Sequence, residues 1–203
     1  MREYERLLAS WPGVLSRSVE DPRPLVEDSL VLLDHLDGVR SLIDVGSGGG
    51  MPGIPLKIAR PQVQVTLLES DGRKAAFLVQ AAAQLGLDVA VAAERAETAA
   101  RGPLRESFDA AVCRALGPMP VVAELCLPFV RVGGSLLAMR TAEEEAAAAY
   151  ELLGGGDPQV VPAPSGARAR GVVVRVPKLR PTPAGYPRRP GQPARRPLLP
   201  QRA

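Results

Sequence analysis

The pattern of apolar residues changes partway along the chain. Residues 1–38 carry apolar positions at helical spacing, interrupted by Pro12-Gly13 and by Asp21-Pro22-Arg23-Pro24, and they predict two helical stretches. From Ser41 onward, short apolar runs alternate with longer helical stretches. Strands that alternate with helices in this way predict βαβ units and a mostly parallel sheet.

Seven short apolar runs are the predicted strands. They are Ser41–Val45, Val63–Glu69, Val89–Ala93, Phe108–Cys113, Ser135–Arg140, Gln159–Pro162 and Gly171–Val176. Helices are predicted at Pro55–Ala59, Arg73–Leu85, Thr98–Leu104, Val121–Val130 and Ala142–Leu153. A short loop of mainly Pro, Gly, Ser and Arg separates the last two strands, which predicts an antiparallel hairpin at the sheet edge.

This order of elements predicts an α/β fold with a doubly wound, Rossmann-like sheet. The same pattern sets the expected domain boundaries: an N-terminal helical segment at 1–38, a ligand-binding α/β domain at 39–177, and a basic, proline-rich C-terminal tail at 178–203. Eight prolines occur from Pro177 to the end of the chain, so we expect no regular structure in the tail.

Composition supports a single domain. Apolar residues make up 46% of the 203 residues, enough for a buried core. Cys113 and Cys126 form no CxxC pair, and we expect reduced thiols in a cytoplasmic protein. We expect no signal peptide, no membrane span and no metal, because no apolar run is long enough and no His, Asp or Glu cluster has metal-ligand spacing.

Charge is distributed unevenly behind the net value of +3. Residues 166–203 hold ten basic side chains and no acidic one, whereas the preceding 165 residues hold 15 basic and 22 acidic ones. A basic tail on an acidic body suits a polyanionic partner, although a solvated terminus explains the charge equally well.

The glycine-rich stretch Asp44–Gly53 lies at the switch point where open α/β sheets bind ligands. A dinucleotide-binding loop needs a small residue where Met51 stands, and a P-loop ends in Gly-Lys-Ser/Thr, which this stretch lacks. The pattern Asp-x-Gly-x-Gly-x-Gly is the one associated with S-adenosylmethionine. Asp44 would engage its cationic amino group; the alternative is that Asp44 only caps the turn.

Two further acids follow the next two predicted strands. Glu69 stands 23 residues after Gly46, where a carboxylate can accept hydrogen bonds from ribose hydroxyls. Glu97 follows the third strand, where an adenine amino group would lie. Either acid alone reads as ordinary surface, but with Asp44 they form a series at three successive strand ends. The series predicts a cofactor site at this edge of the sheet.

The residues after the fourth predicted strand narrow the reaction. Cys113-Arg114-Ala115-Leu116 is not the Asn/Asp-Pro-Pro-aromatic motif that holds an exocyclic amine, and the chain has no Pro-Cys pair of the kind that attacks pyrimidine C6. With no obvious base, a nucleophile that needs no deprotonation fits best. Guanine N7 has a free lone pair at neutral pH, so methyl transfer to it depends on alignment.

The stretch Asp44–Leu56 closely resembles the bacterial small-subunit rRNA guanine-N7 methyltransferases, the RsmG or GidB family. The tail sequence Pro181–Gly191 is the most specific match. Shorter matches are Thr66–Ser70, Arg95–Glu97, Ser107–Asp109 and Cys113–Ala115. The resemblance implies a class I methyltransferase fold, S-adenosylmethionine as cofactor, and methylation of a guanine in 16S ribosomal RNA or the small ribosomal subunit.

Motifs and resemblance together define the candidate site residues. Those expected to bind the cofactor are Asp44, Gly46, Gly48, Met51, Glu69, Ala96, Glu97 and Arg114. No catalytic base is expected, and Arg114 and Arg140 are candidates for positioning the substrate. Those expected to bind RNA, with a tyrosine stacking on a base and arginines at phosphates, are Arg140, Tyr186, Arg188 and Arg189.

Two other functions remain open. A small-molecule methyltransferase would use the same sheet, but it has no need of a basic tail. A non-catalytic RNA-binding or ribosome-assembly protein would keep the fold, but it has no need of Asp44, Glu69 and Glu97 as cofactor acids.

Overall fold

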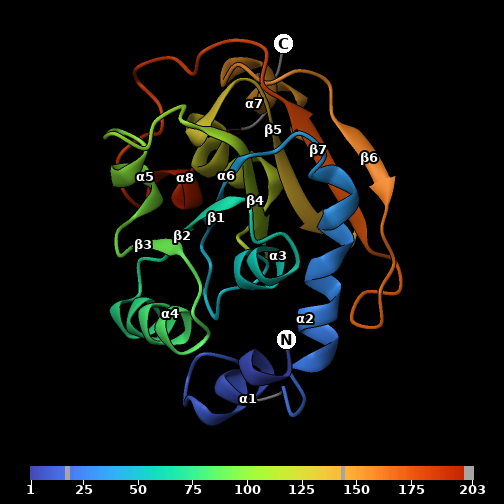
Figure 1. The fold of residues 1–203 in the computed structure, drawn as a ribbon. Coiled ribbons are helices and arrows are strands. Elements are labelled where there is room, and N and C mark those ends of the chain that lie inside the picture. Colours follow the sequence, from blue (N-terminus) through green and yellow to red (C-terminus); the bar gives the residue numbers. More distant parts are fainter. Residues whose placement is uncertain (17–18, 143–144, 199–203) are drawn as a thin grey trace.

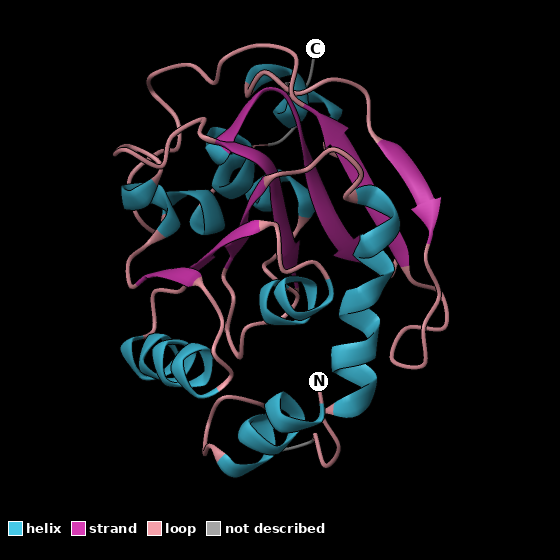
Figure 2. Ribbon diagram, in the orientation of Figure 1, coloured by secondary structure: helices cyan, strands magenta, loops and turns pink. Residues whose placement is uncertain are grey.

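The computed structural model describes residues 1–16, 19–142 and 145–198. Seven strands form one twisted sheet in the order β3-β2-β1-β4-β5-β7-β6, with helices packed on both of its faces (Figures 1 and 2). The strands are β1 Ser41–Val45, β2 Gln64–Leu68, β3 Val89–Ala92, β4 Phe108–Arg114, β5 Val130–Arg140, β6 Gln159–Pro162 and β7 Val172–Pro177. The α/β prediction is confirmed.

The helices fall into two groups by their position along the chain. Those before residue 90 are α1 Arg2–Ser10, α2 Arg23–Ser29, the 3-10 helix η1 Leu30–His35, α3 Gly53–Ala59 and α4 Gly72–Gln84. Those after it are α5 Ala96–Ala99, α6 Met119–Cys126, the 3-10 helix η2 Leu127–Phe129, α7 Ala147–Leu152 and α8 Gln192–Arg195.

Strand direction follows the connections. The first five strands pair in parallel because helical segments connect them, whereas β7 pairs antiparallel with both β5 and β6. The hairpin of β6 and β7 at the sheet edge is therefore as predicted from the short loop between them. The carboxyl ends of β1, β2, β4 and β5 all meet at one edge of the sheet, where the glycine-rich stretch begins.

Alternate strand residues build two cores, one on each face of the sheet. Ile43 of β1 and Leu136 of β5 join the core that α5, α6 and α7 cover. Leu42 and Leu137, one residue away on the same strands, join the core that α1 to α4 cover. Because side chains point alternately to opposite faces, continuous apolar runs are what such a doubly covered sheet requires.

Several elements differ from the sequence predictions: α5 spans Ala96–Ala99 rather than Thr98–Leu104, and α6 spans Met119–Cys126 rather than Val121–Val130. β5 begins at Val130 rather than Ser135, because Val130 already pairs with Phe108 of β4. The register then shifts, and regular pairing resumes between Ser135 and Ala110. α7 begins at Ala147 rather than Ala142, and residues 143–144 of that predicted helix lie outside the described part. The expectation of no regular structure after Pro177 is wrong: α8 forms because Pro193 occupies its first turn, where no backbone N–H is needed.

A buried lysine fixes the start of the tail. Residues 199–203 of the tail lie outside the described part. Lys178 is fully buried, and its Nζ donates to the carbonyls of Leu127 at 2.9 Å and Leu153 at 3.1 Å and to the Thr182 hydroxyl. Glu106 lies 3.4 Å from the same nitrogen. From there the tail runs over the sheet to α8, which lies beside α6 (Figure 1).

We expect Lys178→Met to lower the free energy of unfolding by about 2–4 kcal/mol, because the Leu127 carbonyl loses its donor and the Leu153 carbonyl keeps only the Thr182 hydroxyl. Denaturant unfolding of the wild type and the variant measures the change. Arg189→Met, at an exposed position of the same tail, is the matched control and should change stability little. Equal stability of all three proteins would show that the lysine contacts contribute nothing.

Candidate active site

The glycine-rich loop after β1 forms the centre of the site. The backbone N–H groups of Gly46 and Ser47 both donate to the Leu68 carbonyl, at 2.9 and 3.0 Å, so the loop crosses the end of β2. Gly46 has a φ of 72°, and a Cβ there would lie 2.6 Å from a methyl group of Leu116. Only glycine meets both conditions without strain.

Asp44 lies beneath this loop with its side chain fully buried. Its Oδ2 accepts the N–H of Gly53 at 2.9 Å, at the start of α3, while its Oδ1 has no hydrogen-bond partner among the residues that the structure describes. Burial raises the pKa of the Asp44 carboxyl to about 7, although the Gly53 N–H works against that shift. Asp44 therefore caps the turn with one oxygen, and its other oxygen remains able to accept a hydrogen bond.

Glu69, just after β2, joins the glycine loop to α4. The carboxylate is buried, with Oε2 accepting the Gly48 N–H and Oε1 accepting the Asp71 N–H, each at 2.8 Å. A carboxylate has about four acceptor positions, so both oxygens retain lone pairs after these two bonds. The structure thus brings together Glu69 and Gly48, two of the residues predicted to bind the cofactor.

A narrow pocket opens between the glycine loop and the residues after β3. Gly46 and Leu116 line one side and Ala96, Glu97 and Leu125 line the other. The Glu97 carboxylate is nevertheless engaged: Oε1 accepts from Arg95 at 2.8 Å and from the N–H of Gly191 in the tail at 2.8 Å. Ala96 and Glu97, which were predicted to contact the cofactor, thus lie at this pocket, and the contact of Glu97 with the tail was not predicted.

Arg114 ends β4 and connects the glycine loop to the N-terminal segment. Its Nη1 donates to the Leu25 carbonyl at 2.8 Å, and its Nη2 lies 3.3 Å from the sulfur of Met51. Asp28, itself buried, lies 3.7 Å from this guanidinium. Arg114 and Met51, 63 residues apart in the sequence, are therefore neighbours at one edge of the sheet.

Arg140 ends the adjacent strand β5, and its Nη1 donates to the Gly117 carbonyl at 2.7 Å. Arg168, from the loop between β6 and β7, donates to the Arg140 carbonyl and pairs with Asp28 at 2.9 Å. Sequence reasoning missed Asp28 and Arg168. An acid on an apolar helix face was a usable signal for Asp28, whereas nothing in the loop sequence marks Arg168.

Helix α1 covers the glycine loop from outside, which the sequence analysis did not predict. Tyr4 is fully buried and its hydroxyl donates to the Gly49 carbonyl at 2.6 Å. Burial, together with the nearby Asp44 carboxylate, raises the pKa of Tyr4 well above its usual value. Leu8 and Val14 close in on Gly49 so tightly that a Cβ there would lie 3.0 and 2.9 Å from them.

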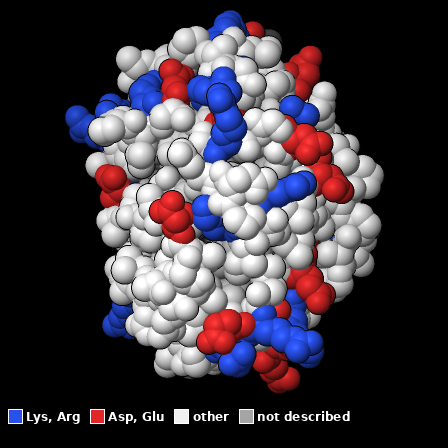
Figure 3. Space-filling model, in the orientation of Figure 1, with Lys and Arg blue, Asp and Glu red and all other residues white. Residues whose placement is uncertain are grey.

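The residues predicted to bind RNA in the tail lie apart from Arg140, against α5 and α6. Tyr186 is half-buried and packs on the core beneath those helices. Arg188 points inward to Glu124, whereas Arg189 is exposed. Over much of the face seen in Figure 3, Lys and Arg side chains lie close to acidic ones, so charge there is mixed.

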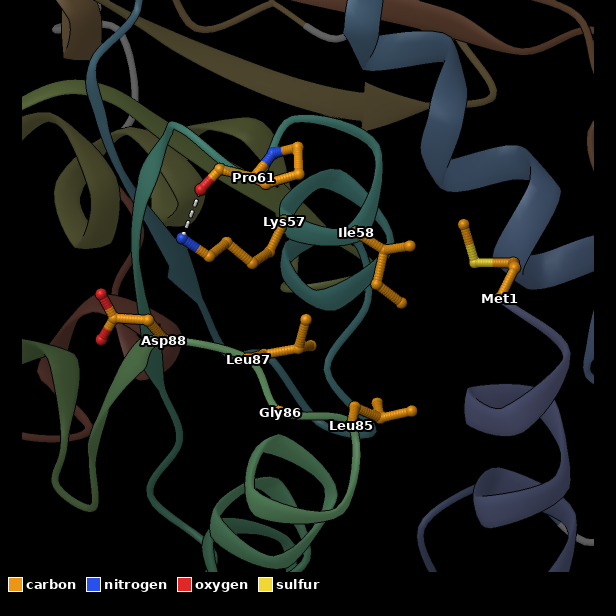
Figure 4. A pocket seen from close by; sticks show the side chains of 8 residues that line it. All are labelled: Met1, Lys57, Ile58, Pro61, Leu85, Gly86, Leu87 and Asp88. Carbon is orange, nitrogen blue, oxygen red and sulfur yellow. Dashed lines mark hydrogen bonds between the residues drawn. The ribbon is translucent and has the colours of Figure 1, made fainter.

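A second pocket lies at the opposite edge of the sheet, between α3, α4 and Met1 (Figure 4). Ile58, Leu85 and Leu87 line it, and the amino group of Lys57 is taken up by the Pro61 and Val63 carbonyls. Across the described ranges, no three His, Cys, Asp or Glu side chains gather to hold a metal ion. No helix in that part of the chain is long and apolar enough to cross a membrane.

Comparison with known families identifies a match over most of the chain. The family model described as rRNA small subunit methyltransferase G matches residues 13–159. Proteins named ribosomal RNA small subunit methyltransferase G are 46% identical in Moorella thermoacetica and 40% identical in Rubrobacter xylanophilus. The alignments cover 87% of this chain and 78% of the Moorella protein, and 98% of this chain and 82% of the Rubrobacter protein.

Solved structures show the same fold at low sequence identity. PigF with SAH has a TM-score of 0.60 at 14% identity, covering 77% of this chain but only 55% of PigF. Geranyl diphosphate methyltransferase in complex with SAM has a TM-score of 0.58 at 17% identity, covering 87% of this chain and 90% of that one. The chain thus spans little more than half the length of the first and nearly all of the second.

We expect Gly46→Ala to destabilise the chain by about 1–3 kcal/mol, because the new methyl group meets Leu116 at a φ of 72°. In the double variant, Leu116→Ala removes the side chain that the new methyl group would meet. Thermal unfolding of the wild type, the two single variants and the double variant is compared, and the double variant should lose less stability than the sum of the two single losses. Additive effects would show that Leu116 does not press on the loop.

Proposed function

The chain belongs to the rRNA small subunit methyltransferase G family, and on that basis we propose that it transfers a methyl group from S-adenosylmethionine to N7 of a guanine in 16S ribosomal RNA. The observation that carries the proposal is the glycine loop over a buried Asp44 with one unpartnered oxygen, inside the matched region. The small-molecule and non-catalytic alternatives gain no support from the relatives, whose name specifies ribosomal RNA.

We infer that the cofactor is held at the glycine loop. Asp44 Oδ1 suits its amino group, Glu69 suits its ribose, and Gly46 with Ala96 borders the pocket. The remaining candidates are Gly48, Met51, Glu97 and Arg114. When bound, the cofactor supplies the methyl group on a sulfonium. Because the Glu97 carboxylate is already shared by Arg95 and Gly191, we assign Glu97 to the pocket wall.

The substrate is proposed to enter beside β4 and β5. Arg140, at the end of β5, is proposed to contact an oxygen of the guanine or a phosphate. Arg114, at the end of β4, is only 16% exposed and donates to the Leu25 carbonyl, so it is proposed to position the substrate by holding the wall beside it. Methylation at N7 needs a lone pair held in line with the methyl group, so orientation replaces a general base. Both arginines therefore act by positioning rather than by proton transfer.

The RNA contacts are proposed to extend to the tail. Arg189 is exposed and Tyr186 half-buried, and together they offer a cation for phosphate and a ring for stacking. Arg188 is a weaker candidate, since its guanidinium is held by Glu124 and its side chain is only 19% exposed. With ribosomal RNA or the small subunit as substrate, the proposed activity takes place in the cytoplasm.

We expect cofactor affinity to depend on pH through Asp44. The free carboxyl has a pKa raised to about 7 and must lose its proton to pair with a cation, so affinity should rise about tenfold per pH unit up to about pH 7 and then level off. Calorimetric titration with S-adenosylmethionine at several pH values below and above 7 measures this affinity. Asp44→Asn should bind weakly with no such slope, while Glu69→Gln keeps the slope; a slope retained in Asp44→Asn would contradict the assignment.

The methylated atom is expected to be guanine N7. Purified chain, S-adenosylmethionine and small subunits that lack the modification are incubated, and the RNA is treated with borohydride and aniline, which cleaves at N7-methylguanine. Naked 16S RNA is tested in parallel to show which form is the substrate. Methylation found only at N2 of guanine or at C5 of a pyrimidine would rule out the proposed product, and Asp44→Asn is the control for cofactor dependence.

A further inference from the structure

We propose that the tail is a positioning element of the cofactor pocket, held in place by the Arg188–Glu124 ion pair. Arg188 and the adjacent Arg189 then have different tasks: Arg188 keeps the pocket wall in place, and Arg189 faces solvent, where RNA can reach it. The inference rests on the proposed cofactor site, because it assigns the tail a role in that site in addition to any contact with RNA.

The Arg188–Glu124 ion pair attaches the tail to the α/β domain through a buried carboxylate. Glu124, on α6, is fully buried, and its Oε2 lies 2.5 Å from Nη2 of Arg188. The Arg188 backbone N–H and Nε each donate to Glu124 Oε1 at 2.8 Å. Three donors of one residue thus meet both oxygens of one buried carboxylate, and such a carboxylate is costly to leave without its partner.

Two arginines of the α/β domain hold the tail backbone ahead of this pair. Arg105 donates to the carbonyls of Tyr186 at 2.8 Å and Thr182 at 2.6 Å. Arg101 donates to the Pro187 carbonyl at 2.5 Å. Both follow α5, so the tail is bound along its length to the segment that forms one wall of the pocket. A freely solvated tail would not form these hydrogen bonds.

The attachments end at the pocket itself. Gly191 donates its N–H to Glu97, whose carboxylate also binds Arg95, and Glu97 lines the pocket. Leu125, next to Glu124 on α6, lines the same pocket. The tail is therefore bonded to α5 and α6 beside the two pocket-lining residues. Loosening it frees Glu97 and the α6 turn, and a pocket that is not preorganised binds its ligand less tightly.

The test compares two neighbouring arginines that carry the same charge. Arg188→Ala is expected to raise the dissociation constant for S-adenosylmethionine about tenfold, whereas Arg189→Ala leaves it unchanged. Binding of 16S RNA should show the reverse: the slope of log affinity against log salt flattens by about 0.7–0.9 in Arg189→Ala but not in Arg188→Ala. In steady state, Arg188→Ala should raise KM for the cofactor and leave KM for the small subunit unchanged.

Two further variants separate positioning from loss of fold. Arg188→Lys keeps the charge without the fork of donors and should recover part of the cofactor affinity. Arg188→Ala with Glu124→Gln leaves no unpaired buried charge, so it should fold as the wild type does and still bind cofactor weakly. In the wild type, cofactor should also slow amide hydrogen exchange over residues 186–192.

Each outcome bears on the proposal. Wild-type cofactor affinity in the double variant, or exchange over 186–192 that cofactor does not slow, overturns the positioning role. If the slope of log RNA affinity against log salt flattens equally in Arg188→Ala and Arg189→Ala, Arg188 contacts RNA and the division of tasks is wrong. Failure of the wild-type chain to bind S-adenosylmethionine is a separate result, because it contradicts the proposed function and not the attachment of the tail.

Discussion

A carboxylate buried at the end of β1 is the constraint on which the site depends. Asp44 lies under the glycine loop and uses one oxygen to cap α3, so the loop must turn tightly above it. Burial raises the pKa of the Asp44 carboxyl, and the nearby Arg114 guanidinium offsets only part of that shift. The second oxygen has no partner within the described residues, and this unsatisfied position is the observation on which the proposed binding role of the loop rests.

Buried ion pairs connect both terminal segments to this centre. Asp28 on α2 binds Arg114 and Arg168, and Glu124 on α6 binds Arg188 of the tail. A buried pair adds little net stability compared with apolar packing, but it is costly to break, because the remaining charge is stranded. The two segments are therefore held in one arrangement, and each places backbone or side chains beside the pocket or the glycine loop.

The sheet and the glycine loop were predictable because their signals are local. Continuous apolar runs between helical stretches marked every strand, since parallel strands covered on both faces need apolar residues throughout. The errors also arose from local signals. The glycines of β5 led to a predicted start after its true first residues, and the prolines of the tail predicted no regular structure where Pro193 permits a helical turn. The pattern of acids at strand ends pointed to the correct edge of the sheet because parallel strands end together.

The sequence by itself determined the fold class, the switch-point loop and the acids around it, because these follow from periodicity and short motifs. Only the tertiary structure decided which neighbouring charge faces inward. Arg188 and Arg189 are equivalent in the sequence, yet one meets Glu124, 64 residues away, and the other faces solvent. The same holds for Gly191 and Glu97, 94 residues apart, since contacts between distant residues depend on the path of the whole chain.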